Sequence, residues 1–506
     1  MKNKKFPVWL TIEQKDKTLH LRLTAPSTIY VLPIILANRP CYDDIPRSLY
    51  GITGWNNDAR PLTEKLVTQL SGGYPLGNVA PLPLLLSVLL LAYTLTLYAK
   101  RCLSGAGQII PALAAGFLVI ANPYFLSNLS YQFDCVTMTL ALCAAILPYV
   151  VPEKKALYKI FLFSFFLCMV TFTTYQPCCG VYIGLWFLEL FFMLSSARVD
   201  IPRLFVQASA CAFSVIVYKY VILNHYIRPA NGGWQPDAYQ FGWKADGGLF
   251  YAITQNFRVF TDLIDEFLQG VPALPLLLFG ILVVSGLGCT AWDVMHQKKP
   301  LPLRIFSLLY VLFLPAIVTF ASMLPLLVLT PSIFSISAHS LVCLASTGLW
   351  AAVMIASLCR RLKRLTAILF LPCLLFGFTF SYTYGNAMAS QQQYETYLTH
   401  SIVHDLETLN ADNIYRAITV SGRAPRSPET ARLTKKYPLF RRIVPSYLTN
   451  SSYLGGAILL QYSREVFEFD DFTEQDQILT DSTPPSLENS IYACYESGDK
   501  IIILFK

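Results

Sequence analysis

The sequence predicts an α-helical polytopic membrane protein with about 11 transmembrane helices (range 9–12) and a small C-terminal α/β domain outside the membrane. Apolar residues make up 54% of the 506 residues and charged residues only 14%, whereas soluble proteins carry about 25% charged residues. Long stretches carry no charge, and one of them, 305–359, has room for two spans. Of the 70 charged residues, 26 lie in the last 122, 385–506. This composition excludes a soluble enzyme, a DNA-binding protein and a secreted disulfide scaffold as descriptions of the whole chain.

The uncharged stretches predict the transmembrane helices in chain order. The N-terminus is basic and is not followed by the apolar core and cleavage site of a signal peptide. The expected spans are 21–38, 81–99, 108–126, 135–151, 157–174, 176–194, 204–223, 270–291, 305–325, 338–357 and 366–384. We therefore expect a transmembrane domain over 1–384 and a separate C-terminal domain over 385–506.

The C-terminal domain shows a different pattern. An amphipathic helix is expected at 388–409, and short apolar strands are expected at 414–422 and 500–505, with helical stretches between them. The pattern is typical of a small α/β domain, and its sequence contains no constellation that would activate a nucleophile.

Basic residues in the short loops predict the orientation in the membrane. Loops such as 100–101, 154–159 and 360–364 are rich in Lys and Arg, whereas the hairpins 122–133, 173–177 and 326–337 have none. Basic loops face the cytoplasm, so the N-terminus is expected there and the C-terminal domain outside. Segments 39–80 and 224–268 then become two long outer loops. The net charge of +12 on 1–384 reflects this topology, and we expect no nucleic-acid partner.

The first outer loop carries the residues best suited to chemistry. Residues 38–62 read NRPCYDDIPRSLYGITGWNNDARPL and place acidic, basic and aromatic side chains beside the end of the first span. These residues are Asp43, Asp44, Arg47, Trp55, Asp58 and Arg60. On a short helix, Arg47 would share a face with Asp43 and Asp44, which lie four and three positions earlier.

Carboxylates beside guanidinium groups suit transfer from a phosphate leaving group to an alcohol. A carboxylate can remove the proton of an attacking hydroxyl, and arginine binds phosphate oxygens in a fork. Arg47 and Arg60 are the candidates for the phosphate, and Trp55 and Asp58 for a sugar. Trp55 could stack on a sugar ring or lie among lipid headgroups. The alternative is an ordinary surface loop with local salt bridges.

A second candidate stretch precedes the span at 135–151. Asp134 follows Tyr131 and Phe133, and an ionisable group at membrane depth is costly enough to suggest function. The alternative is that Asp134 caps the helix that follows. In the second outer loop, Arg228 and Trp234 are further candidates for sugar binding.

Two motifs resemble a known family. The string YDDIPRSLYGITGW, followed by ARPL, resembles the first outer loop of bacterial Gtr-type serotype-converting glucosyltransferases, which modify the O-antigen of lipopolysaccharide. The stretch NPYFLSNLSYQFDCVTMTLALCAAILPY, 122–149, is similar to that family's Asn-Leu-Ser-Tyr-x-Phe-Asp signature. The family usually has Gly before the Arg-Pro pair, where this chain has Ala59.

The resemblance implies a membrane glycosyltransferase of the GT-C class in the bacterial inner membrane, with its C-terminal domain in the periplasm. Such enzymes take a sugar, here glucose, from a polyprenyl-phosphate donor and pass it to a lipid-linked or O-antigen glycan. The catalytic base would be Asp44 or Asp43, with Asp44 favoured. Arg47 and Arg60 would bind the donor phosphate, and Trp55, Asp58, Tyr131 and Asp134 the sugar or acceptor. No cofactor is expected, although the adjacent carboxylates could hold a divalent metal.

Two other functions remain open on the sequence: a flippase or transporter of lipid-linked glycans, and a glycan polymerase. Many transporters are built from internal repeats, and 81–223 and 270–384 do not resemble one another. A polymerase would share the many spans and the long outer loops.

Overall fold

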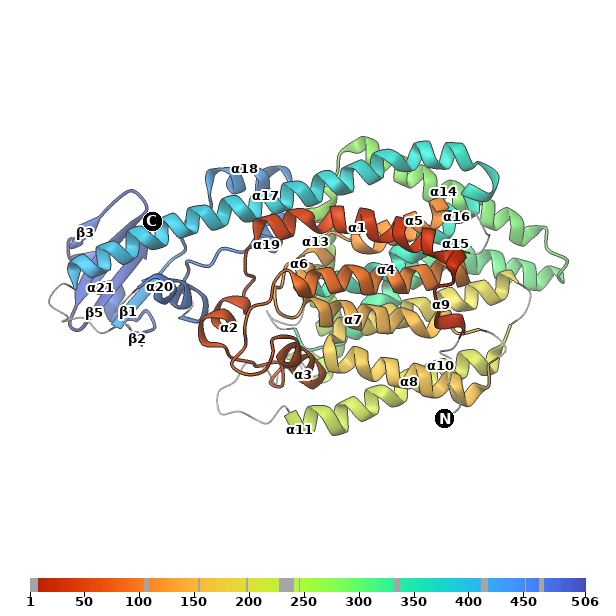
Figure 1. The fold of residues 1–506 in the computed structure, drawn as a ribbon, viewed down its shortest axis with the longest axis horizontal. Helices are drawn as coiled ribbons and strands as arrows, with labels where there is room; N and C mark the ends of the chain where they lie inside the picture. The colour runs from red at the N-terminus through yellow and green to blue at the C-terminus, as the bar shows by residue number, and fades with distance from the viewer. Residues whose placement is uncertain are drawn as a thin grey trace.

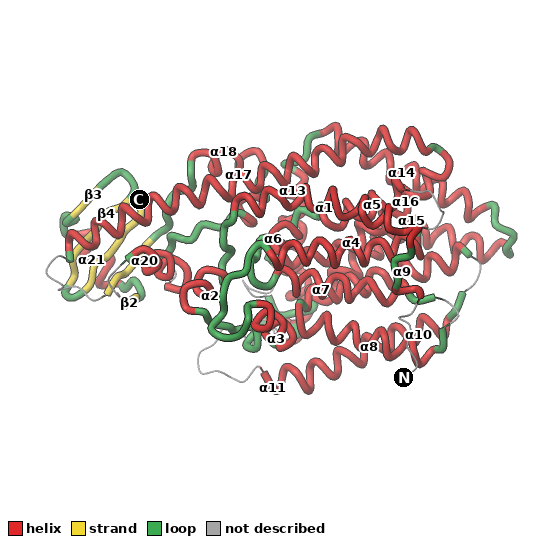
Figure 2. Tube along the Cα trace, in the orientation of Figure 1, coloured by secondary structure: helices red, strands yellow, loops and turns green. Residues whose placement is uncertain are grey.

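The structure, a computed structural model, describes residues 8–506 except 104–108, 153–154, 197–198, 227–240, 245, 332–336, 411–416, 451 and 464–467. A bundle of long, roughly parallel and antiparallel helices forms one body, and a small sheet lies beyond one end of it (Figures 1 and 2). Two short helices, α2 (Asp44–Tyr50) and α3 (Pro61–Leu70), lie at that same end. We refer to it below as the α2 end.

In the described part of the chain, nine helices are long and apolar enough to cross a bilayer. The helical geometry is expected there, because backbone groups in lipid can only be satisfied by hydrogen bonds within the segment. The spans are α1 (Lys17–Ala37), α4 (Leu82–Cys102), α8 (Leu157–Thr174), η4 and α9 (Gln176–Ser195), α10 to α11 (Ile201–Tyr226), α14 (Ala273–Met295), α15 (Leu301–Leu327), η7 and α16 (Ala338–Arg361), and α17 (Lys363–Leu409).

The polytopic fold class is confirmed. Nine of the predicted spans coincide with these helices, and the other two, 108–126 and 135–151, coincide with shorter apolar helices, Ile109–Ile120 (α5) and Cys135–Val150 (α7 and η3). The exact number of crossings stays a prediction. The other α-helices of the described residues are α6 (Phe125–Leu129), α13 (Gly248–Leu268), α18 (Pro428–Lys436), α19 (Phe440–Ile443), α20 (Ala457–Tyr462) and α21 (Glu474–Ser482).

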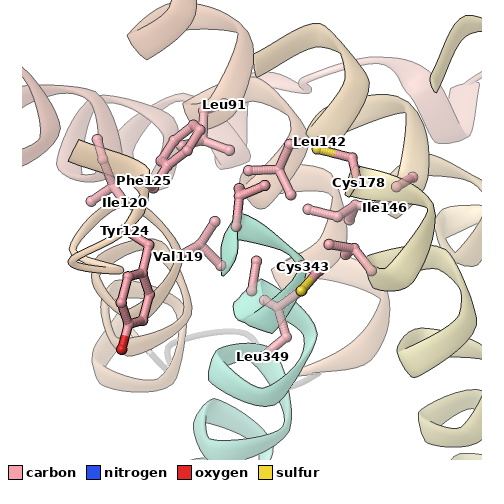
Figure 3. Close-up of a cluster of buried hydrophobic side chains, with 14 of the residues drawn as sticks. Leu91, Val119, Ile120, Tyr124, Phe125, Leu142, Ile146, Cys178, Cys343 and Leu349 are labelled. Atoms are coloured by element: carbon pink, nitrogen blue, oxygen red, sulfur yellow. The ribbon is translucent and has the colours of Figure 1, made fainter. Parts of the chain in front are cut away.

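The bundle is held by an apolar core that continues through most of its length. Figure 3 shows part of it, where side chains of α4, α5, α7 and α16 meet: Leu91, Val119, Ile120, Leu142, Ile146 and Leu349. Small residues allow α9 to approach its neighbours closely. A Cβ on Gly180 would lie 1.9 Å from the carbonyl oxygen of Ser322, and one on Gly184 2.4 Å from Ser346 Oγ. Such small-residue contacts are typical of helices packed inside a membrane.

The predicted division at 384/385 falls inside a continuous helix. α17 runs for 47 residues and extends from the bundle to the C-terminal sheet (Figure 1). The helix expected at 388–409 is therefore the continuation of α17, because the sequence between the two contains no helix stop. Gly385 does not end it, and its missing side chain lets α17 lie against Pro33 of α1, to which a Cβ would come within 2.4 Å.

The C-terminal sheet has five strands in the order β2-β1-β5-β4-β3. Their bounds are β1 (Ala417–Ser421), β2 (Glu468–Phe469), β3 (Leu487–Glu488), β4 (Tyr492–Ser497) and β5 (Lys500–Phe505). β1 is parallel to β2 and β5, while β4 is antiparallel to β3 and β5. The apolar cluster under this sheet includes Leu398 and Ile402 of α17 and also Ile45 of α2. The first loop is thus packed into the core of the C-terminal part.

Candidate functional site

The first loop folds into two short helices joined by tight turns. α2 ends at Tyr50 and is followed by Gly51, whose φ of +64° is left-handed and suits glycine. α3 begins at Pro61, and proline is favoured at the first position of a helix. Between them, Ala59 is fully buried with a φ of +53°, a conformation in which glycine is strain-free. Ala59 therefore occupies a backbone conformation that favours glycine, the residue that the motif resemblance leads us to expect before Arg60.

Asp44 lies at the start of α2 and is fully buried. Its Oδ2 accepts hydrogen bonds from the backbone N–H groups of Cys41 and Gln132, both at 2.8 Å, and its Oδ1 accepts from Phe133 N at 3.4 Å. Burial and then the nearby Asp134 carboxylate together raise the pKa of Asp44 to about 7, against the opposing effect of the hydrogen bonds from Gln132 and Cys41. Asp44 therefore ties the first loop to the chain just before α7.

Asp43 has different surroundings from its neighbour. Its side chain is 39% exposed and forms an ion pair with Arg47, with 3.2 Å between Oδ2 and Nη2. The i to i+4 spacing on α2 produces this pair, as the sequence predicts. The Arg47 guanidinium lies 4.0 Å from the ring centroid of Trp55, a cation–π contact. Asp43 is thus the accessible carboxylate of the pair.

Trp55 and Asp134 meet in the interior, although 79 positions separate them. The fully buried indole donates its Nε1–H to Asp134 Oδ2 at 2.9 Å. Asp134 precedes α7 but makes no side-chain capping bond, so the capping alternative is wrong. Its Oδ1 is buried with no hydrogen-bond partner among the described residues.

We expect the Trp55→Phe variant to lose about 1.5–3 kcal/mol of unfolding free energy, the usual worth of a hydrogen bond to a charged group. Phenylalanine keeps a ring beneath Arg47 but leaves the buried Asp134 carboxylate without its donor. Thermal unfolding of the purified protein in detergent measures the loss. Trp243, which is 60% exposed, provides the control, and an equal loss in Trp243→Phe would contradict the explanation.

Arg60 and Asp58 lie on the other side of the loop, against the start of the η4–α9 span. Arg60 Nε donates to Gln176 Oε1 at 3.0 Å, and its guanidinium lies 5.1 Å from the ring centroid of Tyr175. Gln176 Nε2 donates in turn to the carbonyl of Asp58 at 3.0 Å. Burial raises the pKa of Asp58, and the charge of Arg60 opposes this shift. The arrangement brings the half-buried guanidinium of Arg60 to the edge of an acidic cluster, which we define as Asp43, Asp44, Asp58 and Asp134.

Tyr131 is buried beside this cluster and stacks on Tyr42, with 6.4 Å between ring centroids. His339 of η7 contacts Tyr131 edge-on, at a centroid distance of 6.0 Å. All eight predicted site residues thus lie at the α2 end of the bundle. Asp43, Asp44, Arg47, Trp55 and Asp134 are linked through direct contacts and the 131–134 backbone. Their roles stay predictions.

The sequence analysis did not identify the residues that attach the first loop to the C-terminal part of the chain. Arg39 and Glu395 form a buried ion pair, with 2.5 Å between Nη2 and Oε2. Glu395 Oε1 accepts from Tyr447 N at 2.9 Å, and Tyr447 OH donates to the carbonyl of Pro40 at 2.6 Å. The available signals were a charged residue just after the first span and another within the amphipathic stretch 388–409, but nothing local indicated that these residues are partners.

The structure does not test the predicted sugar-binding roles of two residues in the second outer loop. Arg228 and Trp234 lie outside the described residues. In the described part of the chain, no group of three or more His, Cys, Asp or Glu side chains is arranged to hold a metal ion.

Comparisons with known proteins relate this site to a family. A family model described as "Glucosyl transferase GtrII" matches residues 32–355, which include the first loop and Asp134 but not the C-terminal part. An uncharacterised 55.3 kDa protein in the gtrB 5′ region of Salmonella phage P22 is 24% identical over 480 residues, covering 94% of this chain and 96% of that protein. No solved structure matches the chain.

Proposed function

The chain belongs to the GtrII glucosyl transferase family, and from this premise we propose that it transfers a glucosyl group from a polyprenyl-phosphate donor to a lipid-linked or O-antigen glycan. We place the reaction at the periplasmic face of the bacterial inner membrane, with the N-terminus in the cytoplasm. The family supports a glucosyltransferase, and the structure supports a multi-pass membrane protein. The donor, the acceptor and the orientation are our proposal.

One observation carries this proposal: a partly exposed carboxylate, Asp43, is paired with one arginine, and a second arginine lies in the same loop, at the point where apolar helices end. Asp43 is ion-paired with Arg47, while Arg60 lies half-buried at the edge of the same loop. A lipid-linked sugar phosphate has an apolar tail, an anionic phosphate and a polar sugar. The α2 end offers matching surroundings for each of these parts.

The proposed reaction is a single displacement. Asp43 removes the proton of an acceptor hydroxyl as that oxygen attacks the anomeric carbon of the sugar. The new glycosidic bond forms while the bond from the anomeric carbon to the phosphate oxygen breaks, and polyprenyl phosphate leaves with the electron pair. One displacement inverts the configuration, so a β-linked donor yields an α-linked product. The step as proposed needs no metal or cofactor.

The two adjacent carboxylates then have separate roles. The motif alone favoured Asp44 as the base, but its oxygens accept three backbone N–H groups and it is fully buried. We therefore assign proton removal to Asp43 and positioning of the loop to Asp44. Arg47 and Arg60 would offset the charge that develops on the leaving phosphate, and Trp55, Asp58, Tyr131 and Asp134 would shape the surroundings of the sugar or the acceptor.

Purified full-length protein incubated with synthetic polyprenyl-phosphate sugars and a glycan acceptor tests this function. We expect the glucose donor to be consumed and the acceptor to gain the mass of one hexose. Glycans from cells with and without the protein separate the alternatives. A change of chain length alone would indicate a polymerase, and loss of surface glycan alone would indicate a transporter, and either result would overturn the proposal.

A further inference from the structure

A pocket of about 240 Å³ lies at the α2 end, between the ends of α1, α4 and α7. One wall is polar and is formed by Asn38, Arg39 and the segment 130–132. The lining also includes an apolar wall with side chains from two spans: Ile34 and Ile35 of α1, and Pro83 and Leu84 of α4. The mixed lining fits a ligand with both a polar group and an apolar attachment.

Side-chain amides of the polar wall form a hydrogen-bonded network whose members can each accept or donate further hydrogen bonds. Gln132 Nε2 donates to Asn38 Oδ1 at 3.2 Å, and Gln132 Oε1 accepts from Asn78 Nδ2 at 2.6 Å. A side-chain amide carries two donor hydrogens and two acceptor lone pairs, so each keeps capacity for a further partner. Arg39 is buried, and its Nε–H has no acceptor among the described residues.

The charge in this wall favours a neutral polar ligand. Glu395 already neutralises Arg39 across 2.5 Å. The groups that keep capacity are the side-chain amides and the Nε–H of Arg39, which suit the alternating donors and acceptors of sugar hydroxyls. The volume is below the about 300–1,000 Å³ of sites for drug-sized ligands, so it suits one sugar ring rather than a stretch of polysaccharide.

The polar wall is hydrogen-bonded directly to the first loop. The backbone N–H of Gln132 donates to Asp44 at 2.8 Å. Tyr131 lines the pocket and stacks on Tyr42, the residue before Asp43. Asp43 itself does not line the pocket, but a sugar there would contact Tyr131, whose ring stacks on the residue next to the carboxylate to which we assign proton removal.

We propose that this pocket binds the hexose of the lipid-linked donor, which enters sideways from the bilayer between α1 and α4. The hydroxyls face Asn38, Arg39 and Gln132, and the lipid passes the apolar wall at Ile35 and Leu84. The inference rests on the proposed function and assigns its donor subsite. A hexose of the glycan acceptor shares the same chemistry, so the experiment separates the two sources.

Three variants test the subsite. Ile35→Trp fills the apolar side of the pocket, and Gln132→Ala removes a polar side chain while keeping the backbone N–H that Asp44 accepts. Leu36→Trp is the matched control, because Leu36 is the next residue of α1, is 72% exposed and does not line the pocket. Each protein is purified at full length, and its unfolding temperature is compared with wild type.

Steady-state kinetics with synthetic polyprenyl-phosphate glucose provides the first readout. We expect Ile35→Trp and Gln132→Ala to raise the KM for the donor by about tenfold. The kcat and the KM for the acceptor stay near wild type, and Leu36→Trp matches wild type throughout. An unchanged donor KM in both pocket variants, or a rise confined to the acceptor KM, would overturn the inference.

Equilibrium binding of the same donor, without acceptor, separates this inference from the proposed function. Weaker donor binding by the two pocket variants, but not by Leu36→Trp, supports the subsite even if no sugar is transferred. Equal binding by all four proteins overturns the subsite while leaving a transfer activity of the wild type intact.

Discussion

The Asp43→Asn variant is expected to lose about 10²–10⁴-fold in the rate of sugar transfer, the usual contribution of a general base. Asparagine has nearly the same shape as aspartate but cannot accept the acceptor's proton. Because Asp43 is 39% exposed and its ion pair with Arg47 lies partly in solvent, the unfolding temperature should stay close to wild type. The rate is measured with purified protein, saturating donor and a glycan acceptor, alongside thermal unfolding.

Asp44→Asn should behave differently from its neighbour. Its side-chain amide would point a donor at backbone N–H groups that the carboxylate now accepts, so the loop loses at least one buried bond. We expect a loss of about 1–3 kcal/mol of unfolding free energy, together with reduced transfer. Full activity in both single variants would refute the assignment of the acidic pair, and a stable but inactive Asp44→Asn would return the role of base to Asp44.

The pH dependence of stability gives an independent check on Asp44. Its folded pKa of about 7 exceeds the value of about 3.9 for an exposed aspartate, so the native protein binds this proton more tightly than the unfolded chain. The stabilisation from that proton is complete at low pH and is lost as the pH rises through 7. As the pH rises from 5 to 8, the unfolding temperature of the wild type should therefore fall relative to that of Asp44→Asn. A constant difference would contradict the raised pKa.

The Glu395→Gln variant is expected to lose about 3–5 kcal/mol of unfolding free energy, because it leaves the buried Arg39 guanidinium without its counter-charge. The two side chains are only 1% and 5% exposed. The same glutamate also accepts from Tyr447 N, so the contact between the first loop and the C-terminal part weakens as well. Thermal unfolding in detergent measures the loss, and transfer activity should fall with it.

The ion pair of Lys506 and Glu488 provides the matched control. Its side chains are 40% and 57% exposed, and exposed pairs contribute about 0–1 kcal/mol. Glu488→Gln should therefore change stability little. The double variant Arg39→Met with Glu395→Leu should recover much of the loss, since replacing both members of a buried pair removes the uncompensated charge. Equal effects of Glu395→Gln and Glu488→Gln would show that the buried pair does not secure the loop.

The spans were predictable because crossing a bilayer is a local requirement. Any run of about 20 apolar residues satisfies it without help from the rest of the chain, so 157–174 and 305–325 could be placed from the sequence alone. The same local requirement does not locate the boundary of a domain, so the division predicted at 384/385 did not correspond to the end of a helix. The change from apolar to polar composition near Gly385 marks where lipid contact ends, but α17 does not end there.

The candidate site divides in a similar way. Contacts within a few residues, such as the i to i+4 pair of Asp43 and Arg47, follow from helix geometry and were predicted. The bond between Trp55 and Asp134 joins residues 79 positions apart, and although Asp134 was a candidate from its place at the start of a span, nothing in the sequence indicated that Trp55 is its partner. The different surroundings of Asp43 and Asp44 were not visible in the sequence, where the two are adjacent and chemically identical.

By itself, the sequence determined that this is a multi-pass helical membrane protein with its chemistry-bearing residues in the loop after the first span. Tertiary structure alone decided which carboxylate is exposed, that Asp134 bonds to Trp55 rather than capping α7, and that Arg39 pairs with Glu395 across 356 positions. The physical reason is range. Hydrophobicity and helix spacing act over a few turns of the chain, whereas burial and the pairing of buried charges depend on which distant segments pack together.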